Sequence, residues 1–229
     1  MRRNKKRSSA PWVGNIRSVD VGERLRLVPI WERGVEKSNR LEIVIDPGPA
    51  FGIGDHPTTI MALEFLEREI KIFREKGPPP AMLDVGTGTG VLSIAGMAMG
   101  TGFTVGLDID PSAVFTARRN LQINALTLSV DPGLAAFFIG GVQSVGRTFE
   151  IVAANLAAPT LLRIKDDLIA CTGSLLILSG IAEVMADEVI GNYGSGGLKL
   201  IRREQREGWA AAVLYQCACK AVRSGEPFL

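Results

Sequence analysis

Short runs rich in valine, isoleucine and leucine alternate with segments of helical periodicity through most of this 229-residue chain. The apolar runs show little of the two-residue alternation typical of a strand with one solvated face, so both faces of these strands should be buried. Strands that alternate with helices favour a parallel sheet with helices on both sides. We therefore expect a doubly wound, mostly parallel α/β sheet of seven strands that ends in an antiparallel hairpin.

The same patterns give approximate bounds for the elements. Strands are expected over residues 24–31, 41–48, 81–86, 103–109, 134–140, 149–156, 174–180, 198–208 and 209–222. Helices are expected over 56–73, 91–99, 111–126, 159–171 and 181–194, and prolines near several of these starts suit the first turn of a helix.

The stretch DVGTGTG, residues 84–90, places a glycine at every second position after the expected strand 81–86. Gly86 and Gly88 allow a tight turn there, and Gly90 allows the next helix to pack closely. A ligand can approach the backbone amides of such a turn without meeting a Cβ. The pattern predicts a binding site at this edge of the sheet; a purely structural turn capped by Asp84 is the alternative.

Asp108 ends the following strand, about twenty residues later, where an acid accepts hydrogen bonds from ribose hydroxyls. Asp110, which precedes a proline, better suits a helix cap. The glycines and Asp108 together predict a bound nucleoside. A dinucleotide site would carry G-x-G-x-x-G instead of the G-x-G-x-G found here, which weighs against the alternative of an oxidoreductase that uses a nicotinamide cofactor.

The G-x-G-x-G spacing preceded by Asp84 resembles S-adenosylmethionine-dependent methyltransferases. Two further segments, DPGPAFGIGDHPTT (46–59) and ANLAAP (154–159), are similar to those of ribosomal protein L11 methyltransferases, and the resemblance runs from about residue 19 to about residue 213. It implies a Rossmann-like class I methyltransferase fold, S-adenosylmethionine as cofactor, and methyl transfer to lysine side chains or α-amines of a protein.

The resemblance also implies roles for individual residues. Phe51, Gly52 and Thr58 match positions that cover the cofactor, Gly86 and Asp108 match positions that hold it, and Asn155 matches the polar residue beside the transferred methyl group. The expected cofactor-binding residues are Phe51, Gly52, Thr58, Asp84, Gly86, Gly88, Gly90, Asp108 and Asn155, of which Asn155 is also the expected catalytic residue; no metal site is expected.

The chain departs from the family pattern in two respects. Ile53 stands where the family has a threonine, and the residues before the loop are too few for the family's separate N-terminal domain, which grips the ribosomal protein. We expect a disordered basic tail over 1–18, N-terminal strands with a cofactor-covering loop over 19–55, and a methyltransferase domain over 56–229. The expected substrate is a protein, with a ribosomal protein as one candidate. Another protein, such as an electron-transfer flavoprotein beta subunit, and a non-catalytic cofactor-binding module remain alternatives.

The NLAAP segment, residues 155–159, fits transfer to an amine. An unperturbed lysine has a pKa near ~10.4, and an apolar channel lowers that value by disfavouring the charged form. Asn155 offers an amide oxygen to the amine, although it could instead cap the next helix. The segment lacks an aromatic that would stack on a flipped base, so we expect no direct nucleic-acid substrate. His56, the single histidine, is expected to order its loop, with a role as a base as the alternative.

The remaining features concern the compartment. The basic start, MRRNKKRSSA, has no apolar segment behind it, and no run approaches the ~20 apolar residues that span a bilayer, so we expect no membrane association and a cytoplasmic protein. The tail lacks aromatics, which favours a solvated terminus over a handle for RNA. The three cysteines, Cys171, Cys217 and Cys219, are expected to be core thiols and not a disulfide framework or a metal site.

Overall fold

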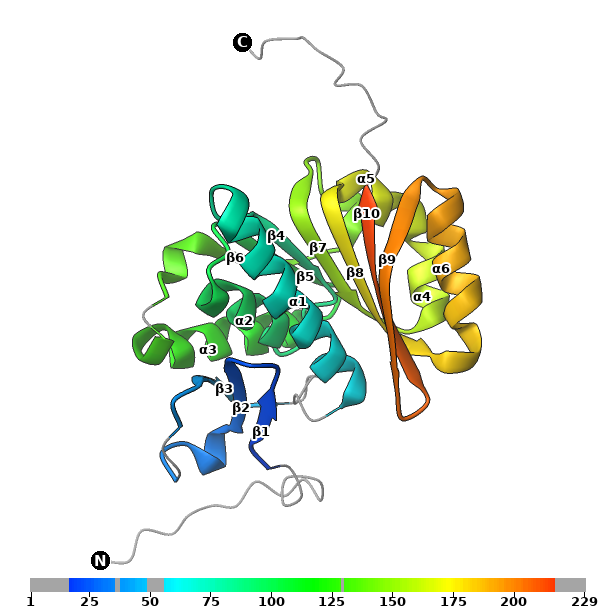
Figure 1. Cartoon of the computed structure of the whole chain (residues 1–229). Helices are drawn as coiled ribbons and strands as arrows, with labels where there is room; N and C mark the ends of the chain where they lie inside the picture. The colour runs from blue at the N-terminus through cyan, green and yellow to red at the C-terminus, as the bar shows by residue number, and fades with distance from the viewer. Residues whose placement is uncertain (1–16, 36–37, 49–55, 129, 217–229) are drawn as a thin grey trace, which may run out of the picture.

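A computed structural model, which describes residues 17–35, 38–48, 56–128 and 130–216, contains two sheets (Figure 1). The larger has seven strands in the order β6-β5-β4-β7-β8-β10-β9, and the smaller has the order β1-β2-β3. The strands are β1 (Val19–Val21), β2 (Leu25–Pro29), β3 (Leu41–Ile45), β4 (Met82–Val85), β5 (Thr104–Asp108), β6 (Ala135–Ile139), β7 (Phe149–Asn155), β8 (Thr172–Ala182), β9 (Leu198–Arg206) and β10 (Trp209–Gln216).

The pairings confirm the predicted fold class. Strands β4 to β8 pair with one another in parallel, while β10 pairs antiparallel with both β8 and β9. The chain moves outward from β4 through β5 to β6, then returns to place β7 on the other side of β4. Such a reversal of strand order opens a crevice at the carboxyl ends of the strands, between β4 and β7.

Helices cover both faces of the large sheet. They are α1 (Pro57–Lys76), α2 (Val91–Met99), α3 (Pro111–Leu128), α4 (Ala158–Arg163), α5 (Lys165–Cys171) and α6 (Ala186–Ser195). Neighbouring residues of a central strand enter opposite cores: Met82 packs with α1, α2 and α3, whereas Leu83 packs with α4, α5 and α6. Burial on both faces explains why the central strands are almost continuously apolar.

The small sheet precedes α1. Strands β1 and β2 are antiparallel, and β3 lies parallel to β2. Its buried residues, including Leu25 and Ile43, belong to the same core as those of α1, α2 and α3. The division of the chain at residues 55 and 56 stays a prediction, as does the character of residues 1–16, which lie outside the described part.

Two expected helices differ from the observed ones. The helix expected over 159–171 is broken at Ile164 (φ −102°, ψ 16°). The break lets α4 line the crevice with one face, while α5 packs in the core that contains Leu83. The helix expected from 181 begins at Ala186, because Ile181 and Ala182 extend β8 by pairing with Ala210 and Trp209. Tertiary packing overrides local helical propensity at both places.

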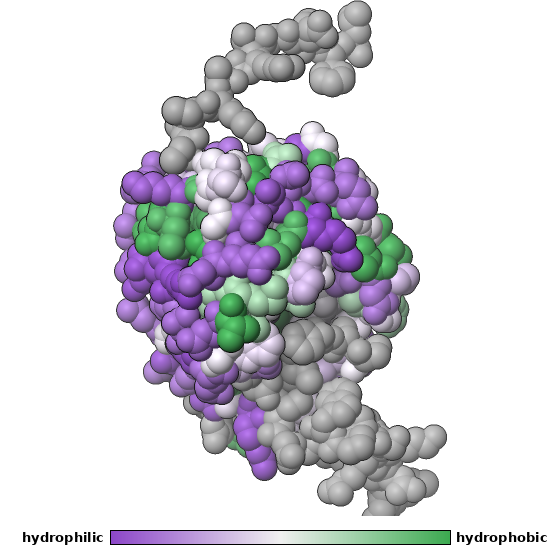
Figure 2. Space-filling view, turned by 90° about the vertical axis from the view of Figure 1, so that its right-hand side faces the viewer, coloured by the Kyte–Doolittle hydropathy of each residue, from purple (hydrophilic) through white to green (hydrophobic). Residues whose placement is uncertain are grey.

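The two edge strands of the large sheet carry different side chains. On the β6 edge, Phe138 and Ile139 are exposed, and the Arg118 guanidinium of α3 donates to the Phe137 carbonyl. The β9 edge, LKLIRREQR, carries five charged residues among nine, together with the exposed Leu200 and Ile201. Figure 2 shows this side of the molecule, on which hydrophilic residues predominate and apolar ones form separate small groups.

Within the described residues, no helix is long and apolar enough to cross a membrane. The same residues contain no cluster of histidine, cysteine or acidic side chains that could hold a metal ion. Cys171 is buried, and this burial raises the pKa of its thiol, as suits a core residue. Cys217 and Cys219 lie outside the described residues.

Candidate functional site

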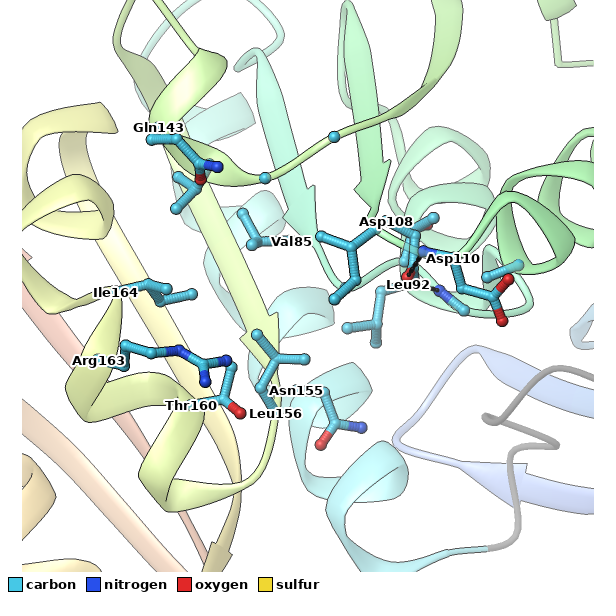
Figure 3. Close-up of a pocket in the computed structure, with 18 of the residues that line it drawn as sticks. Val85, Leu92, Asp108, Asp110, Gln143, Asn155, Leu156, Thr160, Arg163 and Ile164 are labelled. Atoms are coloured by element: carbon cyan, nitrogen blue, oxygen red, sulfur yellow. Dashed lines mark hydrogen bonds between the residues drawn. The ribbon is translucent and has the colours of Figure 1, made fainter.

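A cavity of about 520 Å³ lies at the carboxyl ends of β4, β5 and β7 (Figure 3). This volume is within the range of small-molecule sites. One wall follows the turn after β4 and the end of β5, and the opposite wall is formed by α4. The lining residues are Thr59, Val85, Gly86, Thr87, Gly88, Val91, Leu92, Asp108, Ile109, Asp110, Ala113, Gly140, Gly141, Val142, Gln143, Asn155, Leu156, Thr160, Arg163 and Ile164.

The turn after β4 requires its glycines. Gly86, Gly88 and Gly90 have φ values of 76°, 55° and 81°, a region in which other residues are strained. A Cβ on Gly86 would lie 2.4 Å from the Cδ2 atom of Leu156, and one on Gly90 would lie 3.0 Å from the Cβ of Ala117. The turn is therefore fixed between α3 and the segment after β7, with bare backbone toward the cavity.

Asp84, in the strand before the glycine turn, forms hydrogen bonds with the turn and with the helix that follows it. Its carboxylate oxygen Oδ2 accepts hydrogen bonds from the Thr87 hydroxyl at 2.8 Å and from the Ser93 hydroxyl at 2.7 Å, while Oδ1 has no partner among the described residues. Burial raises the pKa of Asp84 to about 6, although the bonds from Ser93 and Thr87 oppose the rise. Asp84 does not line the cavity, so the geometry gives it contact with the turn and not with the cavity.

Asp108 connects the two strand ends beside the cavity. Its Oδ2 accepts a hydrogen bond from the Gly88 amide at 3.0 Å, and its Oδ1 accepts one from the Asp110 amide at 3.0 Å. A carboxylate oxygen has further lone pairs, so both atoms can still accept from a ligand hydroxyl. Asp110 instead caps α3, as expected, because its carboxylate accepts from the backbone and hydroxyl of Ser112.

Asn155 is the last residue of β7, and its side chain lies at the cavity (Figure 3). Its Nδ2 is 3.3 Å from the Thr59 hydroxyl oxygen. The residue at the N-cap of α4 is Ala157, without a side-chain hydrogen bond, so Asn155 does not cap the helix. The alternative reading of Asn155 as a helix cap is thereby excluded.

The first turn of α1 borders the same cavity. His56 is the N-cap of α1, and its Nδ1 accepts a hydrogen bond from the Thr58 amide and lies 2.8 Å from the Thr58 hydroxyl. Its ring meets Trp209 edge-on, with centroids 5.0 Å apart. These contacts agree with the expected role in ordering the chain. Thr58 is buried, and its carbonyl accepts from the Ser179 hydroxyl.

The structure therefore brings together Gly86, Gly88, Asp108 and Asn155 around one cavity. Asp84 and Gly90 do not line the cavity and contribute to the shape of the turn. Thr58 is buried and does not line the cavity, although its neighbour Thr59 does. Phe51 and Gly52 lie outside the described residues, so their expected role in covering a cofactor stays a prediction.

Some lining residues were missed by the sequence patterns. Thr160 and Arg163 of α4 and Ile164, the residue that follows it, line the cavity, and Figure 3 shows the Arg163 side chain on the cavity wall. Their i, i+3, i+4 spacing indicates a helix and carries no separate signal of a cavity. Gln143 comes from the short helical turn 142–144 after β6, for which no expected element gave a signal.

Comparison with known proteins identifies the family of the chain. The family model described as "Ribosomal protein L11 methyltransferase (PrmA)" matches residues 7–216. The chain belongs to the ribosomal protein L11 methyltransferase family. This membership confirms the predicted family and the methyltransferase class to which the family belongs.

Individual relatives agree. The chain is 36% identical over 219 residues to the ribosomal protein L11 methyltransferase of Pelobacter propionicus, with 93% of this chain and 67% of the relative covered. It is 38% identical over 211 residues to that of Geotalea uraniireducens, with 87% and 64% covered. This chain thus spans about two thirds of the length of the curated relatives that it matches.

Solved structures share the fold. The ribosomal protein L11 methylase of Lactobacillus delbrueckii subsp. bulgaricus superposes with a TM-score of 0.76 at 23% identity, over 88% of this chain and 99% of that one. The magnesium protoporphyrin IX methyltransferase of Synechocystis with bound S-adenosylmethionine has a TM-score of 0.54 at 17% identity, over 69% and 79%. Both confirm the class I methyltransferase fold.

Proposed function

We propose that this protein is an S-adenosylmethionine-dependent N-methyltransferase that acts on lysine side chains or α-amines of a protein, with ribosomal protein L11 as the first candidate substrate. The observation that carries the proposal is the convergence of the glycine turn, Asp108 and Asn155 on one cavity in a chain of this family. A ribosomal protein substrate would also place the protein in the cytoplasm.

The residues around the cavity fit the cofactor. Gly86, Gly88 and the Gly140–Gly141 pair give parts of the wall that carry no side chain, against which a nucleoside can lie closely. Asp108 would accept hydrogen bonds from the ribose hydroxyls, and the Gly86 and Gly88 backbone would face the amino-acid end. When bound, S-adenosylmethionine supplies a methyl group that its sulfonium already activates.

The protein's own residues would prepare the acceptor amine. Because Nδ2 of Asn155 is directed at Thr59, the amide oxygen is left to accept a hydrogen bond from the amine. Leu92 and Leu156 line the same cavity and would make part of its wall apolar. An apolar surrounding lowers the pKa of a lysine, so more of the amine carries a free lone pair. Holding that lone pair in line for transfer is the main task left to the enzyme.

The test has two stages. Titration calorimetry with S-adenosylmethionine, S-adenosylhomocysteine and NAD should show heat with the first two only. Labelled methyl transfer is then measured with purified ribosomal protein L11 and with a cell lysate, and mass spectrometry identifies the product. The absence of heat with both sulfur compounds, in folded protein, would refute the cofactor assignment. Binding without transfer would favour a non-catalytic module, and transfer to a different protein alone would replace L11 as substrate.

A further inference from the structure

Two asparagines of α3 hold strand β3 by its backbone. Asn124 accepts a hydrogen bond from the Val44 amide at 2.8 Å and donates to the Val44 carbonyl at 2.7 Å. Asn120, one helical turn earlier, accepts from the Asp46 amide at 2.9 Å and donates to the Asp46 carbonyl at 3.0 Å. The side-chain amides thus take the place of a neighbouring strand for residues 44 and 46.

The second donor of each amide goes to a different place. In Asn124 it returns to the Asn120 carbonyl of the same helix at 2.8 Å. In Asn120 it reaches the Thr89 carbonyl at 2.9 Å, which belongs to the glycine turn. Asn120 therefore joins the end of β3 to the glycine turn, and Asn124 does not.

Other contacts bring the same elements together. The Arg119 guanidinium pairs with the Asp46 carboxylate at 2.7 Å, and Gly90 approaches Ala117 so closely that a Cβ on the glycine would lie 3.0 Å from the Ala117 Cβ. One face of α3 thus fits against the glycine turn on one side and against residues 44–46 on the other.

We infer that Asn120 is a positioning residue for the cofactor site. It is fully buried and does not line the cavity, so it acts through the backbone of Thr89 and not by contact with a ligand. A turn with three glycines has more conformational freedom to lose than other segments, so an external tie keeps its amides in place before the cofactor binds. This inference rests on the proposed cofactor site.

Asn124 provides a matched control. Both asparagines are fully buried, and each accepts one backbone hydrogen bond and donates two. Alanine at either position removes three side-chain hydrogen bonds and leaves one amide and one carbonyl of the β3 segment without that partner, so both variants should lose stability. The third bond of Asn124 goes to the Asn120 carbonyl inside α3, which keeps its helical partner, so Asn124→Ala should lose no more stability than Asn120→Ala. Only the Asn120 variant releases the glycine turn.

The experiment compares Asn120→Ala and Asn124→Ala with the wild type. Thermal unfolding measures stability, and calorimetry with S-adenosylhomocysteine is run at a temperature at which all three are folded. We expect Asn120→Ala to raise Kd about tenfold and Asn124→Ala to change it by less than about twofold. Hydrogen exchange of residues 86–91, measured without cofactor, should be faster in Asn120→Ala only.

Equal effects of the two variants on Kd, or equal exchange in the glycine turn, would overturn the inference while leaving the proposed function intact. A wild type that does not bind S-adenosylhomocysteine would instead overturn the proposed function and this inference with it. If Asn120→Ala does not fold, Asn120→Asp and Asn124→Asp form the same matched pair, because each keeps the acceptor oxygen and replaces the donating amide nitrogen; equal effects of this pair would count against the inference in the same way.

Discussion

The side-chain amide nitrogen of Asn155 lies 3.3 Å from the hydroxyl oxygen of Thr59, which connects the end of β7 to the first turn of α1 across 96 residues of sequence. Both residues line the cavity, and their contact leaves the amide oxygen of Asn155 available to a ligand. The orientation of the proposed catalytic side chain therefore depends on a helix that is distant in sequence but adjacent in the structure.

Asn155→Ala should leave cofactor binding intact and slow methyl transfer. We expect kcat to fall about 10²-fold, because the amide oxygen that would orient the amine is lost, while Kd for S-adenosylhomocysteine stays within about twofold. Single-turnover transfer and calorimetry measure the two quantities. Thr59→Val, which keeps the shape of the partner but removes its hydroxyl, should reduce kcat less. Full activity of Asn155→Ala would show that the residue is misassigned.

Asp108→Ala should abolish measurable cofactor binding. The substitution removes the proposed ribose acceptor and the acceptor of the Gly88 amide, which corresponds to a loss of affinity of about 100-fold or more. Asp108→Asn keeps one oxygen that can accept from Gly88, so its affinity should lie between those of the wild type and the alanine variant. Calorimetry decides; an unchanged Kd in Asp108→Ala would contradict the site.

The buried Asp84 predicts a specific dependence of stability on pH. Because its pKa rises from 3.8 to about 6 on folding, the folded state binds a proton more tightly than the unfolded state, and its contribution to stability falls as the pH rises through this interval. Between about pH 4 and about pH 7 the wild type should lose about 2 kcal/mol relative to Asp84→Asn, which does not titrate there. Urea unfolding of both proteins across this range measures the difference, which a constant offset would refute.

Gly86→Ala should destabilise the protein by about 2 to 4 kcal/mol, because the alanine would have to adopt a positive φ and its Cβ would collide with the Leu156 side chain. Gly191→Ala is the control: Gly191 lies within α6 and a Cβ there meets nothing within 4 Å, so this variant should gain about 0.5–1 kcal/mol. Chemical denaturation compares the two. A Gly86→Ala protein as stable as the wild type would show that the turn accepts other residues.

The sequence predicted those parts of the fold that depend on local pattern. Helix α2 has the expected bounds, and the parallel order of strands followed from their double-sided burial. The break at Ile164 depends on the different surroundings of α4 and α5, and the late start of α6 depends on the pairing of β8 with β10. No local sequence signal contains that information.

The candidate site shows the same limit. Gly86 and Asp108 were found because a glycine turn and an acid at a strand end have a recognisable spacing. Arg163 lines the cavity only because α4 folds back over it, and Asn120 reaches Thr89 only because α3 lies against the turn. Both looked like ordinary positions of amphipathic helices, since a side chain's partner 31 residues away is set by tertiary packing.

The contact between Arg118 and the Phe137 carbonyl has a consequence for self-association. An edge strand has unpaired backbone groups that can pair with a strand of another molecule. The edge strand β6 also exposes the apolar side chains of Phe138 and Ile139, which would favour such pairing. The Arg118 guanidinium already donates a hydrogen bond to the Phe137 carbonyl. A strand of another molecule that paired with β6 at this carbonyl would first have to displace Arg118. At the opposite rim the charges of β9 resist the same event by repulsion and by their hydration.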